Sequence, residues 1–320
     1  MIKLSLNGAW KMRRLGTVEQ NLIDATVPGS VYSDLMQNGL MEDPFYRDNE
    51  DKSLKLMDFD YEYSKEFLVD EEMLESDEIL LNFDGLDTLA IIKLNDKLLS
   101  STNNMHRSYS FDVKNTLALG NNSLKVTFSS PTKYIAEEYA KQKIWGANAM
   151  PGFPYLRKAH YMFGWDWGPT LPDMGIWRGV SLVGSKRARL EDVFLSQKHV
   201  NGAVELLVDL KIRIFQHSIY QLECVITSPA GEIKSYTVST NAEGAYINKD
   251  IATTQLVCPI EDPQLWWPNG YGAQPLYKVT IHLKSESGQI VLDNKEFNIG
   301  LKVFQAVSYT HLTLPTILRV

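Results

Sequence analysis

The chain has 320 residues, 44% of them hydrophobic and 22% charged, which is enough for two globular domains with their own cores. The net charge of −7 argues against a nucleic-acid or membrane-surface partner, because either would favour a basic face. No stretch approaches 18 apolar residues and the N-terminus MIKLSLNGAWKM lacks a signal-peptide core, so we expect no membrane span and a cytoplasmic location.

The first half of the chain shows strands with few helices. Ser30 is placed to cap a short helix over Val31–Asn38 that ends at Gly39, and Thr132–Lys143 has helical spacing after a proline. Between them, alternating β-branched runs predict strands at Glu78–Phe83, Leu89–Leu94 and Leu124–Ser129.

The segment Arg157–Arg178, RKAHYMFGWDWGPTLPDMGIWR, concentrates three tryptophans and two aspartates. Glycine and proline interrupt it too often for a regular helix, so it is predicted to be a structured loop that presents rings and carboxylates. A flat ring beside a carboxylate suits a sugar, because the ring covers the apolar C–H face while the carboxylate accepts from two hydroxyls.

The second half is again predicted to be strand, in the runs Val180–Val183, Ala203–Phe215, Tyr220–Thr227 and Leu276–Leu283. The fold class is therefore all-β with small helical additions: a jelly-roll, galactose-binding-like sandwich over residues 1–186, then an immunoglobulin-like sandwich over residues 190–303. A basic link at Ser185–Arg189 separates them. Cys224 and Cys258 fall in the second domain, where we expect two free thiols rather than a disulfide.

The final stretch, residues 307–320, continues neither domain. Its sequence VSYTHLTLPTILRV looks like the in-frame translation of a sequencing adaptor, with a genuine strand as the alternative. We expect an N-terminal fragment whose functional content ends near Gln305.

Nine motifs now combine into a family pattern that covers about residues 1–305. They are LNGAW (6–10), VPGSVYSDL (27–35), DPFYRDNE (43–50), FDGLDTLAIIKLN (83–95), HRSYSFDV (106–113), GNNSLKVTF (120–128), FGWDWGP (163–169), GIWRGVSL (175–182) and LWWPNGYGAQPLY (265–277). In this order they resemble the N-terminal part of family 2 glycoside hydrolases, most closely the β-mannosidases. Phe59 departs from the pattern, which would have a tryptophan before the YEY strand.

The resemblance implies a jelly roll, an immunoglobulin-like domain and then a (β/α)8 barrel, which performs the retaining hydrolysis with two glutamates and no cofactor. The barrel is absent here, so no catalytic residue is assigned and the chain alone is expected to be inactive. The implied partners are the missing barrel and an oligosaccharide with terminal β-mannose.

Site residues carry over from the same resemblance. Asp166 is expected to bind hydroxyls of the terminal mannose, with Trp165 as a pocket wall. Trp167 either packs the loop or contacts sugar. Lys158 and His160, with the neighbouring Tyr161, either support the aspartate and line the entrance or are ordinary surface groups. Arg178 is expected to pair with a carboxylate at the base of the loop.

The remaining candidate residues are expected to have structural roles only. The Asn49–Glu50 dipeptide resembles one that carries the acid/base in this enzyme group, but it lies in the first domain and is read as a coincidence. The cluster Trp266, Trp267 and Tyr271 is expected to pack between domains. The histidines and cysteines show no metal-ligand spacing.

Three alternatives stay open. The chain could be a free-standing carbohydrate-binding module, part of a β-galactosidase or β-glucuronidase of the same family, or a structural sandwich without a sugar site. The adaptor-like tail argues against a free-standing module, which would need a genuine C-terminus. The FGWDWGP motif favours β-mannosidase over the other two enzymes, and a structural sandwich would leave this loop without a purpose.

Overall fold

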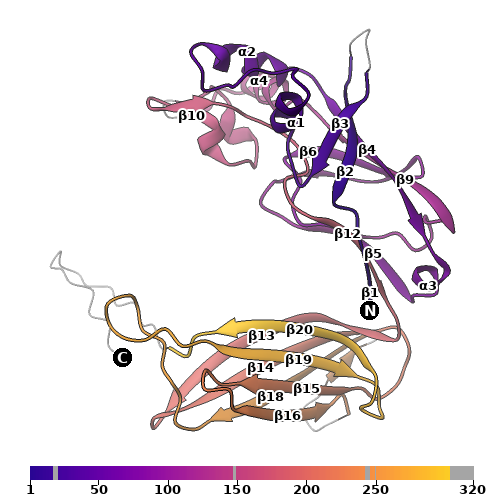
Figure 1. Cartoon of the computed structure of the whole chain (residues 1–320), viewed down its shortest axis with the longest axis vertical. Helices are drawn as coiled ribbons and strands as arrows, with labels where there is room; N and C mark the ends of the chain where they lie inside the picture. Colours follow the sequence, from indigo (N-terminus) through magenta and orange to yellow (C-terminus); the bar gives the residue numbers. More distant parts are fainter. Residues whose placement is uncertain (17–20, 147–148, 242–245, 249, 303–320) are drawn as a thin grey trace. The chain divides into compact units, whose positions relative to one another are not determined.

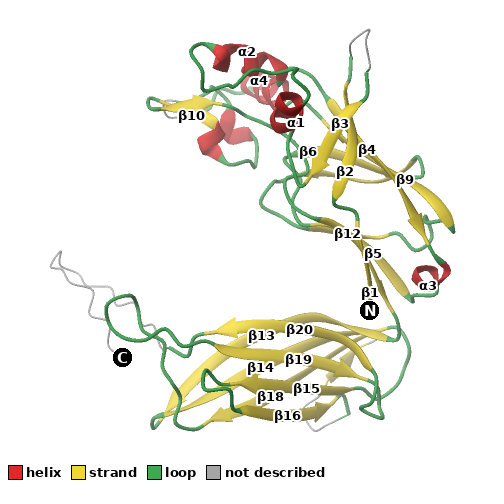
Figure 2. Ribbon diagram, viewed as in Figure 1, coloured by secondary structure: helices red, strands yellow, loops and turns green. Residues whose placement is uncertain are grey.

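A computed structural model represents the protein and describes residues 1–16, 21–146, 149–241, 246–248 and 250–302 (Figure 1). The chain divides into two compact units, the first spanning Ile2–Gly184 and the second beginning at Ser185. Strands dominate both units, and the helices among the described residues all lie in the first (Figure 2). The predicted all-β class is confirmed. The adaptor-like stretch, residues 307–320, lies outside the described residues.

Besides the two-stranded sheet of β10 (Phe163–Trp165) and β11 (Gly168–Thr170), the first unit contains two larger antiparallel sheets. The larger has the order β3 (Ile23–Val27), β2 (Gly8–Arg14), β4 (Tyr61–Val69), β9 (Gly120–Phe128), β6 (Leu89–Leu94) and β7 (Lys97–Asn103). The smaller has the order β1 (Ile2–Ser5), β12 (Val180–Ser185), β5 (Glu78–Phe83) and β8 (Tyr109–Asp112).

One large core lies inside the sandwich of the first unit. Because successive side chains of a strand point to opposite faces, alternate residues are buried along β5, along β9 from Asn122 to Phe128, and at both ends of β4. The rings of Tyr63 and Phe128 meet edge to face in this core with centroids 5.8 Å apart. The motif GNNSLKVTF of the family pattern is the strand β9 of this sandwich.

Short helices decorate this unit. α1 (Val31–Gln37) begins at Ser30, which forms a capping box with Ser33. α4 (Pro131–Lys141) begins with proline at its first position, a favoured site because that N–H would be unpaired in any case. The remaining helical segments are α2 (Asn49–Leu56), α3 (Glu71–Leu74) and the 3-10 turns η1 (Phe153–Tyr155) and η2 (His160–Met162).

The second unit is a sandwich of two four-stranded antiparallel sheets, as expected for an immunoglobulin-like domain. One sheet has the order β13 (Ala188–Val200), β14 (Ala203–Ile214), β18 (Ile251–Ile260), β17 (Tyr246–Asn248). The other has the order β16 (Ile233–Ser239), β15 (Gln221–Thr227), β19 (Tyr277–Lys284), β20 (Val291–Ile299). Cys224 and Cys258 are buried free thiols on opposite sheets.

The tryptophan pair near the end of the second unit packs locally. The Trp266 backbone N–H donates to Leu301 O at 2.9 Å, and the Lys302 ammonium lies 4.3 Å from the Trp266 ring centroid. The Trp267 N–H donates to Ala273 O at 2.9 Å. These contacts are all within the second unit, so a role between domains stays a prediction.

Candidate functional site

The aromatic segment forms a small β-hairpin in the first unit (Figure 1). β10 (Phe163–Trp165) pairs with β11 (Gly168–Thr170), and Asp166 and Trp167 form the turn between them. The sequence predicted a structured loop here without regular helix, and the hairpin is consistent with that. The two short strands themselves were not predicted.

The tip of the hairpin presents its rings and its carboxylate to the outside. Trp167 is 85% exposed and Trp165 is 45% exposed, although indole side chains are normally well buried. The Asp166 side chain between them is exposed as well. The structure therefore brings together Asp166 and Trp165, which are expected to contact sugar, and Trp167, for which the sequence left packing or sugar contact open.

The base of the hairpin is anchored in a small separate core. Phe163 is fully buried with Ile135 of α4 and Leu156. The Met150 N–H donates to Phe163 O at 2.9 Å, and the Leu171 N–H donates to Met162 O at the same distance. The tip is thus exposed while its base is fixed.

Lys158 lies inside the fold rather than at the surface. Its side chain is fully buried, forms an ion pair with Asp87 and donates to Asp173 O at 2.6 Å. Burial lowers the pKa of Lys158, and the Asp87 carboxylate opposes that shift. Lys158 is therefore not a surface group. Its contacts are with Asp87 and Asp173, so support of Asp166 and a place at the pocket entrance both stay predictions.

Asp173 joins the same segment to α1. Its carboxylate accepts from the backbone N–H of Tyr32 at 3.0 Å and of Met174 at 2.8 Å. Burial raises the pKa of Asp173 to about 6, against the lowering effect of these hydrogen bonds. A titratable group therefore lies at the base of the exposed hairpin.

His160 and Tyr161 come just before β10 in the sequence, and Arg178 follows β11 further along the chain. The exposed His160 packs edge-on against Phe153, with centroids 4.8 Å apart, and Tyr161 is 81% exposed. The Arg178 guanidinium lies 4.1 Å from the Trp177 ring centroid. Within the described residues Arg178 has no carboxylate at ion-pair distance, so it stacks on an indole where the sequence predicted an ion pair.

Sequence reasoning missed one residue that touches the hairpin. The Glu50 carboxylate, on α2, accepts the Thr170 backbone N–H of β11 at 2.6 Å. The contact joins positions 120 residues apart, so no local pattern could reveal it. Phe45 and Tyr46, 75% and 57% exposed, lie in the segment that leads into α2.

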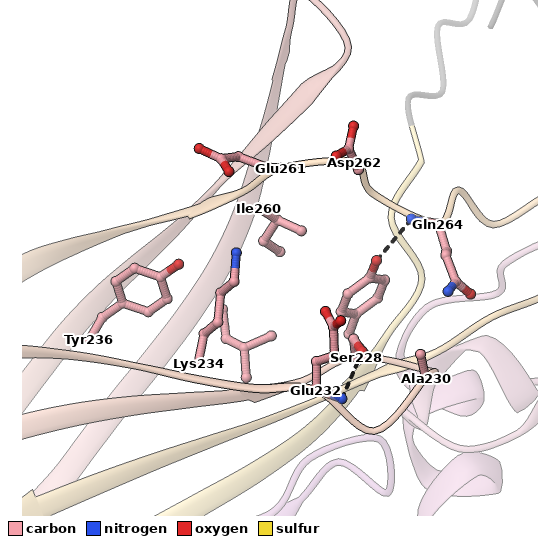
Figure 3. Close-up of a pocket in the computed structure, with 11 residues that line it drawn as sticks. Ser228, Ala230, Glu232, Lys234, Tyr236, Ile260, Glu261, Asp262 and Gln264 are labelled. Atoms are coloured by element: carbon pink, nitrogen blue, oxygen red, sulfur yellow. Dashed lines mark hydrogen bonds between the residues drawn. The ribbon is translucent and has the colours of Figure 1, made fainter.

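A cavity of about 370 Å³ lies in the second unit, near β16 and the end of β18 (Figure 3). Ile226, Ile260 and Tyr277 contribute buried side chains to its lining, and Lys234 lies among acidic side chains at its rim. The Tyr277 hydroxyl accepts the Gln264 backbone N–H at 2.8 Å. No residue singled out from the sequence lines this cavity, so the hairpin remains the better candidate.

The helices in the described part of the chain include none long and apolar enough to cross a bilayer. No group of three or more histidine, cysteine, aspartate or glutamate side chains there is arranged to hold a metal ion.

Family models match both units. The model described as "Glycosyl hydrolase 2 galactose-binding domain-like" matches residues 10–178, and the model "Glycosyl hydrolases family 2" matches residues 188–302. The first match alone covers more than half of the chain.

Curated relatives point the same way. The chain is 31% identical to a β-mannosidase of Mus musculus over 300 residues, which are 89% of this chain and 33% of the relative. It is 32% identical to β-mannosidase B of Aspergillus niger over 295 residues, 88% of this chain and 33% of the relative. The chain therefore spans about a third of the length of the curated relatives it matches.

Solved structures share the fold. The crystal structure of a β-D-mannosidase from Dictyoglomus thermophilum superposes with a TM-score of 0.83 at 32% identity, over 93% of this chain and 36% of that one. An exo-chitosanase from Amycolatopsis orientalis superposes with a TM-score of 0.70 at 20% identity, over 96% of this chain and 34% of that one. The second likeness is one of fold alone.

Proposed function

Because the chain belongs to glycosyl hydrolase family 2, we propose that it forms the two β-sandwich domains of a retaining exo-β-mannosidase that removes terminal β-mannose from oligosaccharides. The family resemblance drawn from the motifs is thereby confirmed, whereas the activity is a proposal. In this proposal two glutamates of a (β/α)8 barrel outside this chain perform the hydrolysis.

The observation that carries the proposal is the hairpin tip, where an exposed carboxylate stands between two exposed indoles. Asp166 would accept from two neighbouring hydroxyls of the terminal sugar, and Trp165 would cover the sugar's apolar face. Trp167 would close the same wall or pack against the barrel. Exposing large apolar side chains such as indoles to water is unfavourable. This supports a ligand or another protein surface as the group that covers them in the working protein.

The test uses the complete enzyme encoded by the gene. We expect hydrolysis of p-nitrophenyl β-mannoside in preference to the β-galactoside and the β-glucuronide. Asp166→Asn should lower kcat/KM by about 10- to 100-fold, because a charge-assisted hydrogen bond is lost. Asp96→Asn is the control, since the exposed Asp96 forms an ion pair with Lys125 and lies outside the hairpin. Equal activity on the three substrates, or equal loss in both variants, would overturn the proposal.

A free-standing binding module is the second candidate, favoured by the same exposed Trp165 and Trp167. In that case the 320-residue chain alone should bind β-mannosides, and Trp167→Ala should abolish the binding. Isothermal titration with β-mannobiose separates the two functions, because the enzyme proposal expects no measurable binding without the barrel.

A cytoplasmic location is a further proposal. It is supported by Cys224 and Cys258, which are free thiols in the structure, as proteins of a reducing compartment usually keep them. Recovery of a tagged protein in the secreted fraction of its host would contradict it.

A further inference from the structure

We propose that Glu50 is a positioning residue, whose carboxylate holds β11 and so fixes where the hairpin presents Asp166. The contact is a hydrogen bond from the Thr170 N–H to Glu50 Oε1, 2.6 Å long, and an ionised acceptor makes such a bond stronger than a neutral one. The consequence for sugar binding rests on the proposed function, but the holding of the hairpin does not.

The hairpin needs such support because two short strands alone are only marginally stable in water. Its β10 side is fixed by the buried Phe163 and by the bond from Met150 N–H to Phe163 O. On the β11 side, the N–H of Thr170 is directed to Glu50. Fixing one strand leaves the tip free to pivot, whereas fixing both defines its direction.

The helix that carries Glu50, α2, is itself fixed within the first unit. The Tyr32 hydroxyl of α1 donates to Ser53 O in α2 at 2.9 Å, and the Asn49 amide donates to Asp43 O at 3.0 Å. Asn49 and Ser53 are both buried, so α2 is held against the unit by polar contacts. Because α2 is fixed to α1, the Glu50 carboxylate has a defined position. Its hydrogen bond from Thr170 therefore holds the hairpin in place relative to both helices.

A simpler role for Glu50 is to stabilise the first turn of α2, where a negative charge interacts favourably with the helix dipole. Asp51 occupies the same first turn and is exposed. Both acids lie in the first turn of α2, but among the hydrogen bonds of the described residues it is Glu50 that bonds to β11, which makes Asp51 a matched control.

The experiment measures amide hydrogen exchange in the 320-residue chain, resolved at Thr170 and over the peptide 163–171. Glu50→Ala should raise exchange in this hairpin by at least about tenfold, because its outer hydrogen bond is lost. Glu50→Gln keeps an acceptor oxygen and should restore most of the protection. Asp51→Ala should leave hairpin exchange unchanged, and amides of β4 and β9 should stay protected in every variant.

Unchanged hairpin exchange in Glu50→Ala would overturn the proposal, as would equal effects of Glu50→Ala and Asp51→Ala. If Glu50→Ala unfolds the unit, hairpin exchange in Glu50→Gln is the deciding measurement. Loss of hairpin protection in Glu50→Gln as well would show that the acceptor oxygen does not hold the hairpin, and would overturn the proposal. Because no sugar is used, failure of the β-mannosidase proposal leaves this result standing. In the complete enzyme, Glu50→Ala should then raise KM for the β-mannoside more than Asp51→Ala does.

Discussion

Asp173 is a titratable residue in the segment that follows the hairpin, and its carboxylate joins that segment to α1. Burial raises its pKa from an ordinary value of 3.8 to about 6, although three hydrogen bonds to its carboxylate act in the opposite direction. The desolvation cost of the charged form therefore exceeds what the Tyr32 and Met174 N–H groups return. The neighbouring Lys158 ammonium, paired with Asp87, reduces that cost only in part.

This shift predicts a pH dependence of stability. Because the pKa of Asp173 is higher in the folded state, its contribution is fully present below about pH 4 and is lost as the pH rises through 6. Relative to Asp173→Asn, the wild type should lose about 2 kcal/mol of unfolding free energy between pH 4 and pH 7, after allowance for partial solvent screening. Urea unfolding of both proteins at the two pH values measures this. A constant difference would contradict the assignment.

Candidate site residues could be predicted from the sequence where they lie next to one another in a single motif. Asp166, Trp165 and Trp167 are consecutive, so the sequence alone predicted that they lie together. Glu50 and Asp87 could not be found in this way, because their partners Thr170 and Lys158 are far along the chain. Buried polar contacts of this kind arise from how the elements pack, and no spacing rule describes them.

At the scale of elements, the hairpin depends on Gly164. Its φ of +86° is a left-handed conformation that costs most residues about 1–2 kcal/mol, and an added Cβ would lie 2.4 Å from Thr170 Oγ1. A glycine at this position therefore lets β10 take this conformation and lie close to the Thr170 side chain of β11.

Gly164→Ala should therefore disrupt the hairpin while leaving the sandwich folded. We expect a change in tryptophan fluorescence and faster exchange over residues 163–171, with a loss of stability of about 2 kcal/mol or less. Gly168→Ala is the control on the partner strand, because the atom nearest to an added Cβ there is 3.8 Å away. Similar effects of both substitutions would show that the hairpin does not depend on the Gly164 conformation.

Elements with their own local signals were predicted, and those without were missed. α1 has a capping box and α4 begins with proline, and both appear close to the expected residues. α2 was missed because its N-cap Asp48 makes no side-chain capping bond and its buried residues, Asn49 and Ser53, are polar. The spacing of apolar residues could not reveal this helix, because hydrogen bonds of polar residues hold it in place.

At the scale of the whole molecule, the described residues form separate hydrophobic cores in the two units. Phe128 lies in the core of the first unit and Ile281 in that of the second, and both are fully buried. The chain divides between these cores at Gly184 and Ser185. A unit with its own core can unfold as its own cooperative transition.

Two core substitutions should therefore act on different transitions in calorimetry. Phe128→Ala should destabilise the first unit by about 3–5 kcal/mol, and Ile281→Ala should destabilise the second by about 2–5 kcal/mol, because each leaves a cavity in a packed interior. Ile281→Val, with an expected cost of about 0.5–1.5 kcal/mol, is the graded control. Each substitution should lower one melting transition by several degrees and leave the other in place. If either substitution lowered both transitions together, the two cores would belong to one cooperative structure, and the stability of the hairpin would depend on the second sandwich as well as the first.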